Sequence, residues 1–240
     1  MKKLFGDAVA AAFSAIPCRR RFPIALRLAH WLHPLARLAE RMGARRLPLN
    51  GPRERMLMFF LHRLLEREVD FEPAVEVRPA RLLEESGGVL ILACHMWMNS
   101  IWLRWLSMGE RKVSLVSVLP SLHPLFGRHH RIEKIPTDAN TYLRIRQRVR
   151  DGRIVYLTLD LRSPRDSFRR VEIDGESLYF SANTFHFARR AAIPILFAFA
   201  RVSDQGRVVV HLMRPSSIEA GAAFDEYCRF ISTEAAQLRA

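Results

Sequence analysis

The sequence has few cysteines, and no pair of them stands at the spacing of a metal site. Cys18, Cys94 and Cys228 are too few and too scattered for a disulfide framework. The histidines likewise form no clear set of metal ligands. The sequence therefore disfavours a disulfide-stapled domain and a metal hydrolase. It predicts reduced thiols in a reducing compartment, and neither a metal nor a cofactor.

The chain also lacks an apolar run long enough to cross a bilayer. Residues 8–16 follow Met-Lys-Lys and superficially resemble the start of a signal peptide. Asp7 precedes this run, and Pro17 and the arginines at 19–21 end it, whereas a spanning helix needs ~20 apolar residues. The basic cluster after the run favours retention on the cytoplasmic side of a membrane.

Acidic residues are in short supply. There are 24 Asp and Glu against 38 Lys and Arg, which gives a formal net charge of +14. Such a charge produces a long-range field that concentrates anionic partners, and nucleic acid, anionic lipid or an acidic carrier protein would all fit it. No nucleic-acid reader motif and no aromatic-basic repeat accompanies the charge, so the sequence disfavours nucleic acid.

Two helical segments are expected in the N-terminal part of the chain. Residues 24–42 place basic side chains at helical spacing opposite a leucine-rich side, which predicts an amphipathic helix with a kink at Pro34. Two interpretations stay open: an in-plane membrane helix with Trp31 at the interface, or a helix packed on the core with a solvated basic face. Residues 52–67 predict a second, buried helix.

From residue 73 onward, short β-type runs alternate with helical stretches. We expect strands at 75–77, 88–94, 113–118, 154–159, 194–200 and 207–213, and helices at 79–85, 98–107, 140–150, 182–191 and 222–238. Several of these strands are continuously apolar, as is typical of a sheet covered on both faces. The sequence thus predicts an α/β fold with a mixed central sheet flanked by helices. Residues 1–72 would form amphipathic, membrane-associating helices and 73–240 the α/β core, in one compact unit.

The run 87–95 is the first candidate for chemistry. It predicts a buried strand that delivers His95 at its carboxyl end, just where a helix should begin. Ligands bind at that edge of open α/β sheets. A histidine with a pKa near neutrality can take a proton from a hydroxyl group and make it nucleophilic. A purely structural histidine is the alternative.

The segment from His95 to Ser100 and the segments after it resemble the lysophospholipid acyltransferase superfamily. The likeness is greatest to the branch of bacterial lipid A (lauroyl/myristoyl) acyltransferases. That family carries a strand ending in the motif H-x4-D/E; here the histidine matches, and Ser100 stands at the acid position. Three further segments follow in the family's order: residues 124–131, 151–160 and 180–199. In all, the resemblance covers roughly residues 73–215.

The resemblance implies a peripheral enzyme at the cytoplasmic face of the bacterial inner membrane. It would transfer a fatty acyl group from acyl carrier protein or acyl-CoA to a hydroxyl of a lipid or glycolipid, with an anionic membrane surface as partner. His95 would be the general base, and the family's acid would orient and stabilise its imidazolium. Replacing that acid by Ser100 should cost several powers of ten in rate, by comparison with the ~10⁴ drop when a triad Asp is neutralised.

Three outcomes of this replacement stay open. Asn99 or Ser100 suffices weakly, another acid such as Asp160 substitutes, or the protein does not catalyse. Asp160 has a second interpretation, as a carboxylate that caps or anchors a loop. A protein that does not catalyse would be an inactive homologue that binds lipid or acyl carrier protein as the partner of an active enzyme.

Several basic and aromatic residues are candidates for substrate contacts. Arg131, Arg162 and Arg165 could hold the phosphate of a lipid head group through forked hydrogen bonds, although surface arginines are often just solvated. The four arginines within 144–150 could dock anionic lipid or acyl carrier protein, or form a solvated helix face. Trp97 could line an acyl-chain pocket, with core packing as the alternative.

Overall fold

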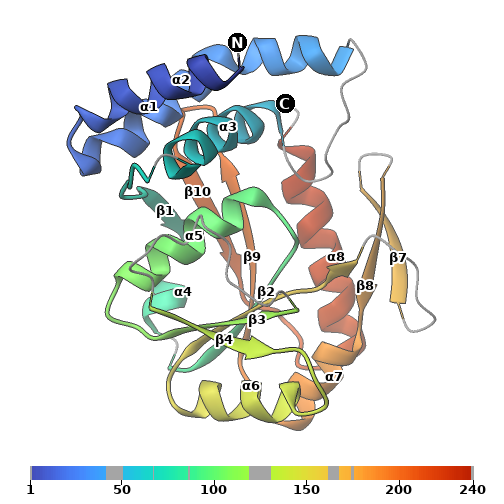
Figure 1. Ribbon diagram of the computed structural model, residues 1–240. Coiled ribbons are helices and arrows are strands. Elements are labelled where there is room, and N and C mark those ends of the chain that lie inside the picture. Colours follow the sequence, from blue (N-terminus) through green and yellow to red (C-terminus); the bar gives the residue numbers. More distant parts are fainter. Residues whose placement is uncertain are drawn as a thin grey trace.

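The computed structural model describes residues 2–41, 51–66, 68–85, 87–118, 131–161, 168–173 and 176–238. Figure 1 shows the arrangement of their helices and strands. In chain order these are α1 (Lys2–Ser14), α2 (Cys18–Arg41), α3 (Pro52–Glu66), β1 (Val75–Arg78), α4 (Arg81–Glu84), β2 (Val89–Ala93), α5 (Trp97–Met108), β3 (Val113–Ser117), β4 (Ile132–Pro136), α6 (Thr141–Arg150), β5 (Ile154–Thr158), β6 (Asp160–Leu161), β7 (Phe168–Ile173), β8 (Glu176–Ser181), α7 (Asn183–Arg190), β9 (Ile195–Val202), β10 (Val208–Met213) and α8 (Ala220–Ala236).

A mixed sheet forms the centre of the molecule, in the strand order β1-β10-β9-β2-β5-β3-β4. Strand β2 pairs in parallel with β9 on one side and β5 on the other, and β3 and β4 continue the parallel part. Strand β10 is antiparallel to β9, and β1 is parallel to β10. The predicted α/β class with a mixed, helix-flanked sheet is therefore confirmed.

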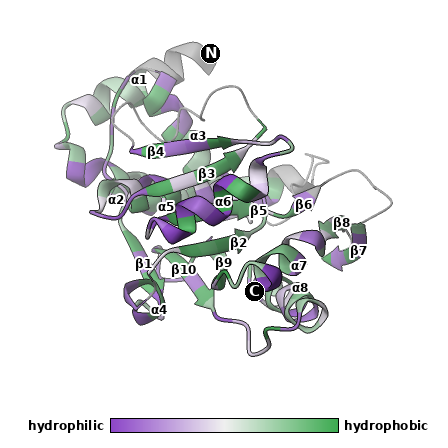
Figure 2. Ribbon diagram, turned by 90° about the horizontal axis from the view of Figure 1, so that it is seen from below, coloured by the Kyte–Doolittle hydropathy of each residue, from purple (hydrophilic) through white to green (hydrophobic). Residues whose placement is uncertain are grey.

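The apolar sequence of β2 explains its central place. All five residues are buried, and their side chains alternate between two cores, as the pleat requires. Val89 and Ile91 pack with side chains of α1, α2, α3 and α5 on one face, whereas Leu90 and Leu92 pack with those of α6, α7 and α8 on the other. Figure 2 shows β2 and β9 mostly in the green of hydrophobic residues and α6 largely in purple.

The N-terminal helices pack on the same core as the sheet. Phe22, Ala25 and Ala29 of α2 are fully buried, and they belong to the core cluster that holds Leu57 of α3 and Val89 of β2. Helix α2 begins six residues before the expected position and runs through Pro34. In the part of the chain that the structure describes, no helix is both long and apolar enough to cross a bilayer.

A second, smaller sheet begins where β5 ends. The chain leaves the central sheet after Thr158, and Asp160 and Leu161 pair with β8, which also pairs with β7. In Figure 1 this sheet lies beside α8. The six predicted strands and seven predicted helices are all present; β4, β6, β7 and β8 were not predicted from the sequence, and α1 was expected only as part of the helical region 1–72. The first residue of the small sheet is Asp160, one of the candidate site residues.

Candidate functional site

His95 stands at the carboxyl end of β2, where the chain leaves the interior. Cys94 is fully buried, and the next side chain, that of His95, is 59% exposed. Helix α5 begins two residues later at Trp97. The apolar strand thus ends with an imidazole that is open to solvent at the sheet edge where ligands bind in such folds.

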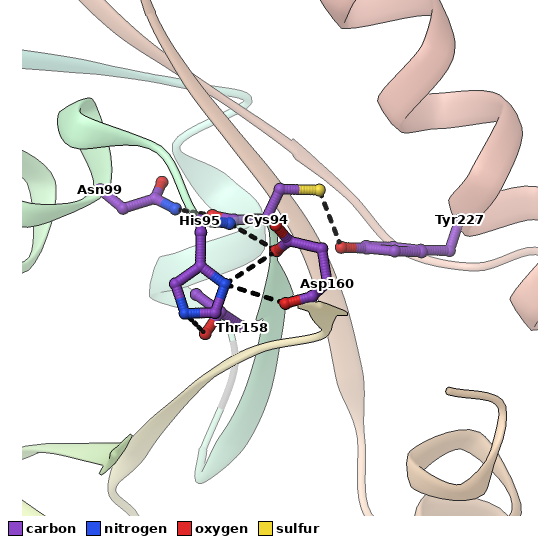
Figure 3. Close-up of polar contacts among 6 residues, drawn as sticks. All are labelled: Cys94, His95, Asn99, Thr158, Asp160 and Tyr227. Carbon is purple, nitrogen blue, oxygen red and sulfur yellow. Dashed lines mark hydrogen bonds and ion pairs between the residues drawn. The ribbon is translucent and has the colours of Figure 1, made fainter. Parts of the chain in front are cut away.

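A buried carboxylate holds the imidazole of His95. Asp160 is 4% exposed; its Oδ1 accepts the backbone N–H of His95 at 2.5 Å and lies 3.1 Å from Nδ1 of the ring. The backbone oxygen of Asp160 lies 3.1 Å from the same Nδ1 (Figure 3). Because both neighbours of Nδ1 are acceptors, this nitrogen carries the proton of the neutral ring, and Nε2 is left as the acceptor.

The acceptor nitrogen faces a hydroxyl group. Oγ1 of Thr158 lies 3.0 Å from Nε2 of His95, on the side of the ring opposite Asp160 (Figure 3). The pairing of β2 with β5 sets this position, because Ala93 is in register with Thr158 and its carbonyl accepts the N–H of Leu159 at 2.9 Å. Thr158 and Asp160 are two residues apart, so their side chains lie on one side of the chain and reach the two nitrogens of one imidazole.

The residues behind the imidazole are buried and neutral. The Tyr227 hydroxyl on α8 lies 3.4 Å from Sγ of Cys94. Burial, and to a smaller extent the charge of Asp160, raise the pKa of the Cys94 thiol well above its usual value. Burial also raises the pKa of Tyr227 well above its usual value. Since the thiolate is the reactive form of cysteine, Cys94 is not a nucleophile at neutral pH.

The structure brings only some of the predicted site residues to the ring. Asn99 is buried, and its amide donates to the Cys94 carbonyl, so it supports the backbone beside His95. Ser100 is partly buried on α5, and the carboxylate at the ring comes from Asp160 instead. Asp160 also accepts the backbone N–H of His95, which agrees with its second interpretation as a carboxylate that anchors a loop. Trp97 packs against the core that contains β2.

Of the three arginines predicted to contact substrate, the structure describes only Arg131. Arg131 directly precedes β4, which is parallel to β3 and β5, so it lies at the edge where the parallel strands begin, away from His95. Arg162 and Arg165 lie outside the described residues, as do residues 124–130 of the second resembling segment.

Two of the four arginines of α6 form ion pairs with acidic residues of the same chain. Arg144 forms an ion pair with Asp138 at 2.8 Å, and Arg148 forms one with Glu133 at 2.5 Å. Arg146 is partly buried, and Arg150 is exposed. These internal pairs lower the net charge that α6 presents to a partner, so the run is a weaker docking site than the sequence alone indicates.

A groove of about 720 Å³ opens at a different place. Its lining residues lie on and near β1, β10 and α8: Arg78, Pro79, His211, Leu212, Met213, Glu226, Arg229, Phe230, Thr233 and Glu234. Met213 at the end of β10 pairs with Phe197 of β9, and Phe197 pairs with Leu92 of β2. Strand β9 therefore separates the groove from β2, and His95, Thr158 and Asp160 are not among the residues that line the groove.

Within the described ranges, no group of three or more His, Cys, Asp or Glu side chains could hold a metal ion. No family model matches the chain, and no curated protein sequence matches it. The functional assignment therefore depends on the geometry around His95. Thr158 was not predicted as a site residue from the sequence. Its position two residues before Asp160 could have indicated it, because this spacing puts both side chains on one side of the strand.

Proposed function

We propose that the protein transfers a fatty acyl group from a carrier thioester to a hydroxyl group of a lipid or glycolipid. His95 is the general base, and Asp160 takes the place of the motif acid. The observation that carries this proposal is the 3.1 Å contact between Nδ1 of an exposed His95 and Oδ1 of a buried Asp160. The acyl donor is acyl carrier protein or acyl-CoA.

The geometry suits the proton transfers that such a reaction needs. Nε2 of His95 accepts the proton of an attacking hydroxyl and returns it to the departing thiolate. The carboxylate of Asp160 fixes the ring tautomer and stabilises the imidazolium that forms between these steps. Helix α5 begins just after His95, so the positive end of its dipole favours the negative charge that develops on the acyl oxygen.

The position of Asp160 supports an enzyme over a catalytically inactive binding homologue. In the family that the sequence resembles, the motif acid follows its histidine on the same stretch of chain. Here Ser100 occupies that position, and a carboxylate 65 residues away along the chain reaches Nδ1 instead. The charge that Ser100 lacks is therefore present at the ring.

One face of α2 supports the proposal of a membrane surface as partner. Trp31, Leu35 and Leu38 are 77%, 58% and 51% exposed and follow each other at helical spacing. Arg27, one turn earlier, is exposed on the same face. The opposite face of α2 packs on α3, as the core-packing interpretation of this helix expects, and the membrane interpretation is proposed for the exposed face alone. An exposed apolar stripe with a basic neighbour fits the interface of an anionic bilayer, here the cytoplasmic face of the bacterial inner membrane.

Release of free thiol tests the enzyme. The purified protein is incubated with a lauroyl thioester of coenzyme A or of acyl carrier protein, and with a lysolipid or a lipid A precursor as acceptor. We expect thiol release in the wild type, none in His95→Ala, and wild-type release in His186→Ala, which removes an exposed histidine of α7. If the wild type binds lipid but releases no more thiol than His95→Ala, the inactive homologue is the correct assignment.

Flotation with vesicles tests the membrane partner. At low salt we expect the protein to float with phosphatidylglycerol vesicles but not with phosphatidylcholine vesicles. Trp31→Ser should weaken flotation at least about tenfold, because an interfacial aromatic anchor is lost. Ile218→Ser is the matched control, since Ile218 is 86% exposed on another part of the surface. Equal flotation of the two variants would refute α2 as the docking face.

A further inference from the structure

We propose that Thr158 is a covalent nucleophile, so that the acyl group passes through an ester on its hydroxyl before it reaches the acceptor. This inference rests on the proposed acyl transfer and specifies its route. It assigns a catalytic role to a residue that the resemblance leaves without one.

The three side chains form a continuous proton relay. Oγ1 of Thr158 lies 3.0 Å from Nε2 of His95, and Nδ1 of the same ring lies 3.1 Å from Oδ1 of Asp160. A hydroxyl, an imidazole and a carboxylate in this order activate the nucleophile of serine hydrolases on several unrelated folds. Here the hydroxyl and the carboxylate come from the end of β5 and the start of β6, and the imidazole from the end of β2. Such strand ends hold a site more rigidly than loops do.

The tautomer decides which hydroxyl the base serves. With the proton on Nδ1, Nε2 of His95 accepts the hydrogen bond, and Thr158 donates it. Direct attack by an acceptor lipid would require its hydroxyl to displace Thr158 from Nε2 first. In the observed arrangement, the group from which His95 is set to take a proton is Thr158 itself.

The neighbouring candidate for a nucleophile is excluded by its surroundings. Cys94 is fully buried beside Tyr227, and its thiol is held neutral. Thr158 is partly exposed at the open side of the ring. A substrate that approaches the exposed imidazole therefore meets the Thr158 hydroxyl and not the Cys94 thiol.

The proposed reaction has two balanced halves. Oγ1 of Thr158 bonds to the acyl carbon of the thioester as its proton passes to Nε2 of His95; the carbon–sulfur bond then breaks, and the thiolate leaves with that proton. In the second half the acceptor hydroxyl gives its proton to Nε2 and bonds to the acyl carbon. The bond from Thr158 to the acyl carbon breaks, and Oγ1 takes the proton back.

Trapping of the intermediate tests this route. Wild-type protein is mixed with lauroyl-CoA without acceptor, quenched in acid within milliseconds to minutes, and its intact mass is measured. We expect a mass increase of one lauroyl group in place of one hydrogen, located by peptide fragmentation at Thr158. Thr158→Ser should keep both the adduct and turnover, whereas Thr158→Val should lose the adduct and at least about 10³-fold of turnover. Valine keeps the branched shape that the strand needs, and unfolding temperatures verify that each variant folds.

Each other result overturns the route, and the failures can be told apart. If Thr158→Val transfers the acyl group to acceptor at the wild-type rate while His95→Ala is inert, the proposed function stands and the covalent route is wrong. If the wild type turns over but shows no adduct at any quench time, Thr158 only orients the ring. An adduct on a residue other than Thr158 also refutes the covalent route. The control variant is Thr233→Ala, which removes another threonine that is exposed. A wild type without thiol release from any thioester removes both proposals.

Discussion

Neutralising Asp160 without changing its shape tests the imidazole–carboxylate pair most directly. In Asp160→Asn the side-chain oxygen can still accept the backbone N–H of His95. The backbone oxygen of residue 160, 3.1 Å from Nδ1, still holds the proton on that nitrogen. The variant therefore loses the negative charge and keeps the tautomer.

The expected loss follows from the distance and from the exposure of the two groups. Unit charges 3.1 Å apart attract by about 5 kcal/mol at an effective dielectric constant of 20 and by about 1.3 kcal/mol in bulk water. Asp160 is 4% exposed but the His95 side chain 59%, so the pair lies between these limits. Taking about 3 kcal/mol, and a factor of ten for each 1.36 kcal/mol, predicts a loss of about 10² in turnover.

Initial rates of thiol release at saturating donor measure this loss. Asp138→Asn is the matched control, because it neutralises an exposed aspartate that pairs with Arg144 away from the ring. A loss of less than about threefold in Asp160→Asn, with His95→Ala inert, would show that Asp160 only anchors the backbone. A loss near 10⁴ would show that the backbone oxygen does not hold the tautomer.

Three further predictions concern single substitutions. Ser100→Glu should change thiol release by less than about threefold, because Asp160 already supplies the carboxylate; a rise of tenfold or more would mean that the ring lacks one. Gly88→Ala should lower the free energy of unfolding in urea by at least about 3 kcal/mol, since an added Cβ would lie 1.6 Å from the backbone oxygen of Val149; a loss under about 1 kcal/mol would contradict this packing. Burial raises the pKa of Glu54, which accepts the Val202 N–H at 2.7 Å. A raised pKa stabilises the fold below the ordinary glutamate pKa, and this contribution is lost as the pH rises through the raised value. Glu54→Gln should therefore unfold at a higher temperature than the wild type at pH 8 and at a similar one near pH 4, as calorimetry would measure; the reverse order would refute the sign.

The central strands could be predicted because their sequences are apolar on both faces. Residues 89–93 and 195–202 read as buried strands whatever their neighbours are. Strands β4 and β7 were missed because charged residues interrupt them, and all three of β4, β7 and β8 lie at or beyond the margin of the central sheet. Helix α1 was expected only as part of the helical region 1–72, because its alanine-rich run resembles the start of a signal peptide and marks no helix end.

The candidate site could be predicted only in part. A histidine at the end of an apolar strand is visible in the sequence, and Asp160 was named as a substitute acid. What the sequence cannot give is the register that sets Ala93 beside Thr158 and so brings both polar residues to His95. Pairing between strands more than 60 residues apart depends on the whole sheet, so no local pattern reveals it.

Because of this pairing, the geometry of the site reports whether β2 and β5 are paired in the correct register. Thr158 and Asp160 reach the imidazole only if β5 lies against β2 in the observed alignment. A slip by a single residue would turn both side chains to the opposite surface of the strand, and neither nitrogen of His95 would find its neighbour. Molecules in which β5 pairs with β2 in a register shifted by one residue would have the circular dichroism of a folded protein and yet be inert. Specific activity per folded molecule would then count how many chains closed the sheet correctly.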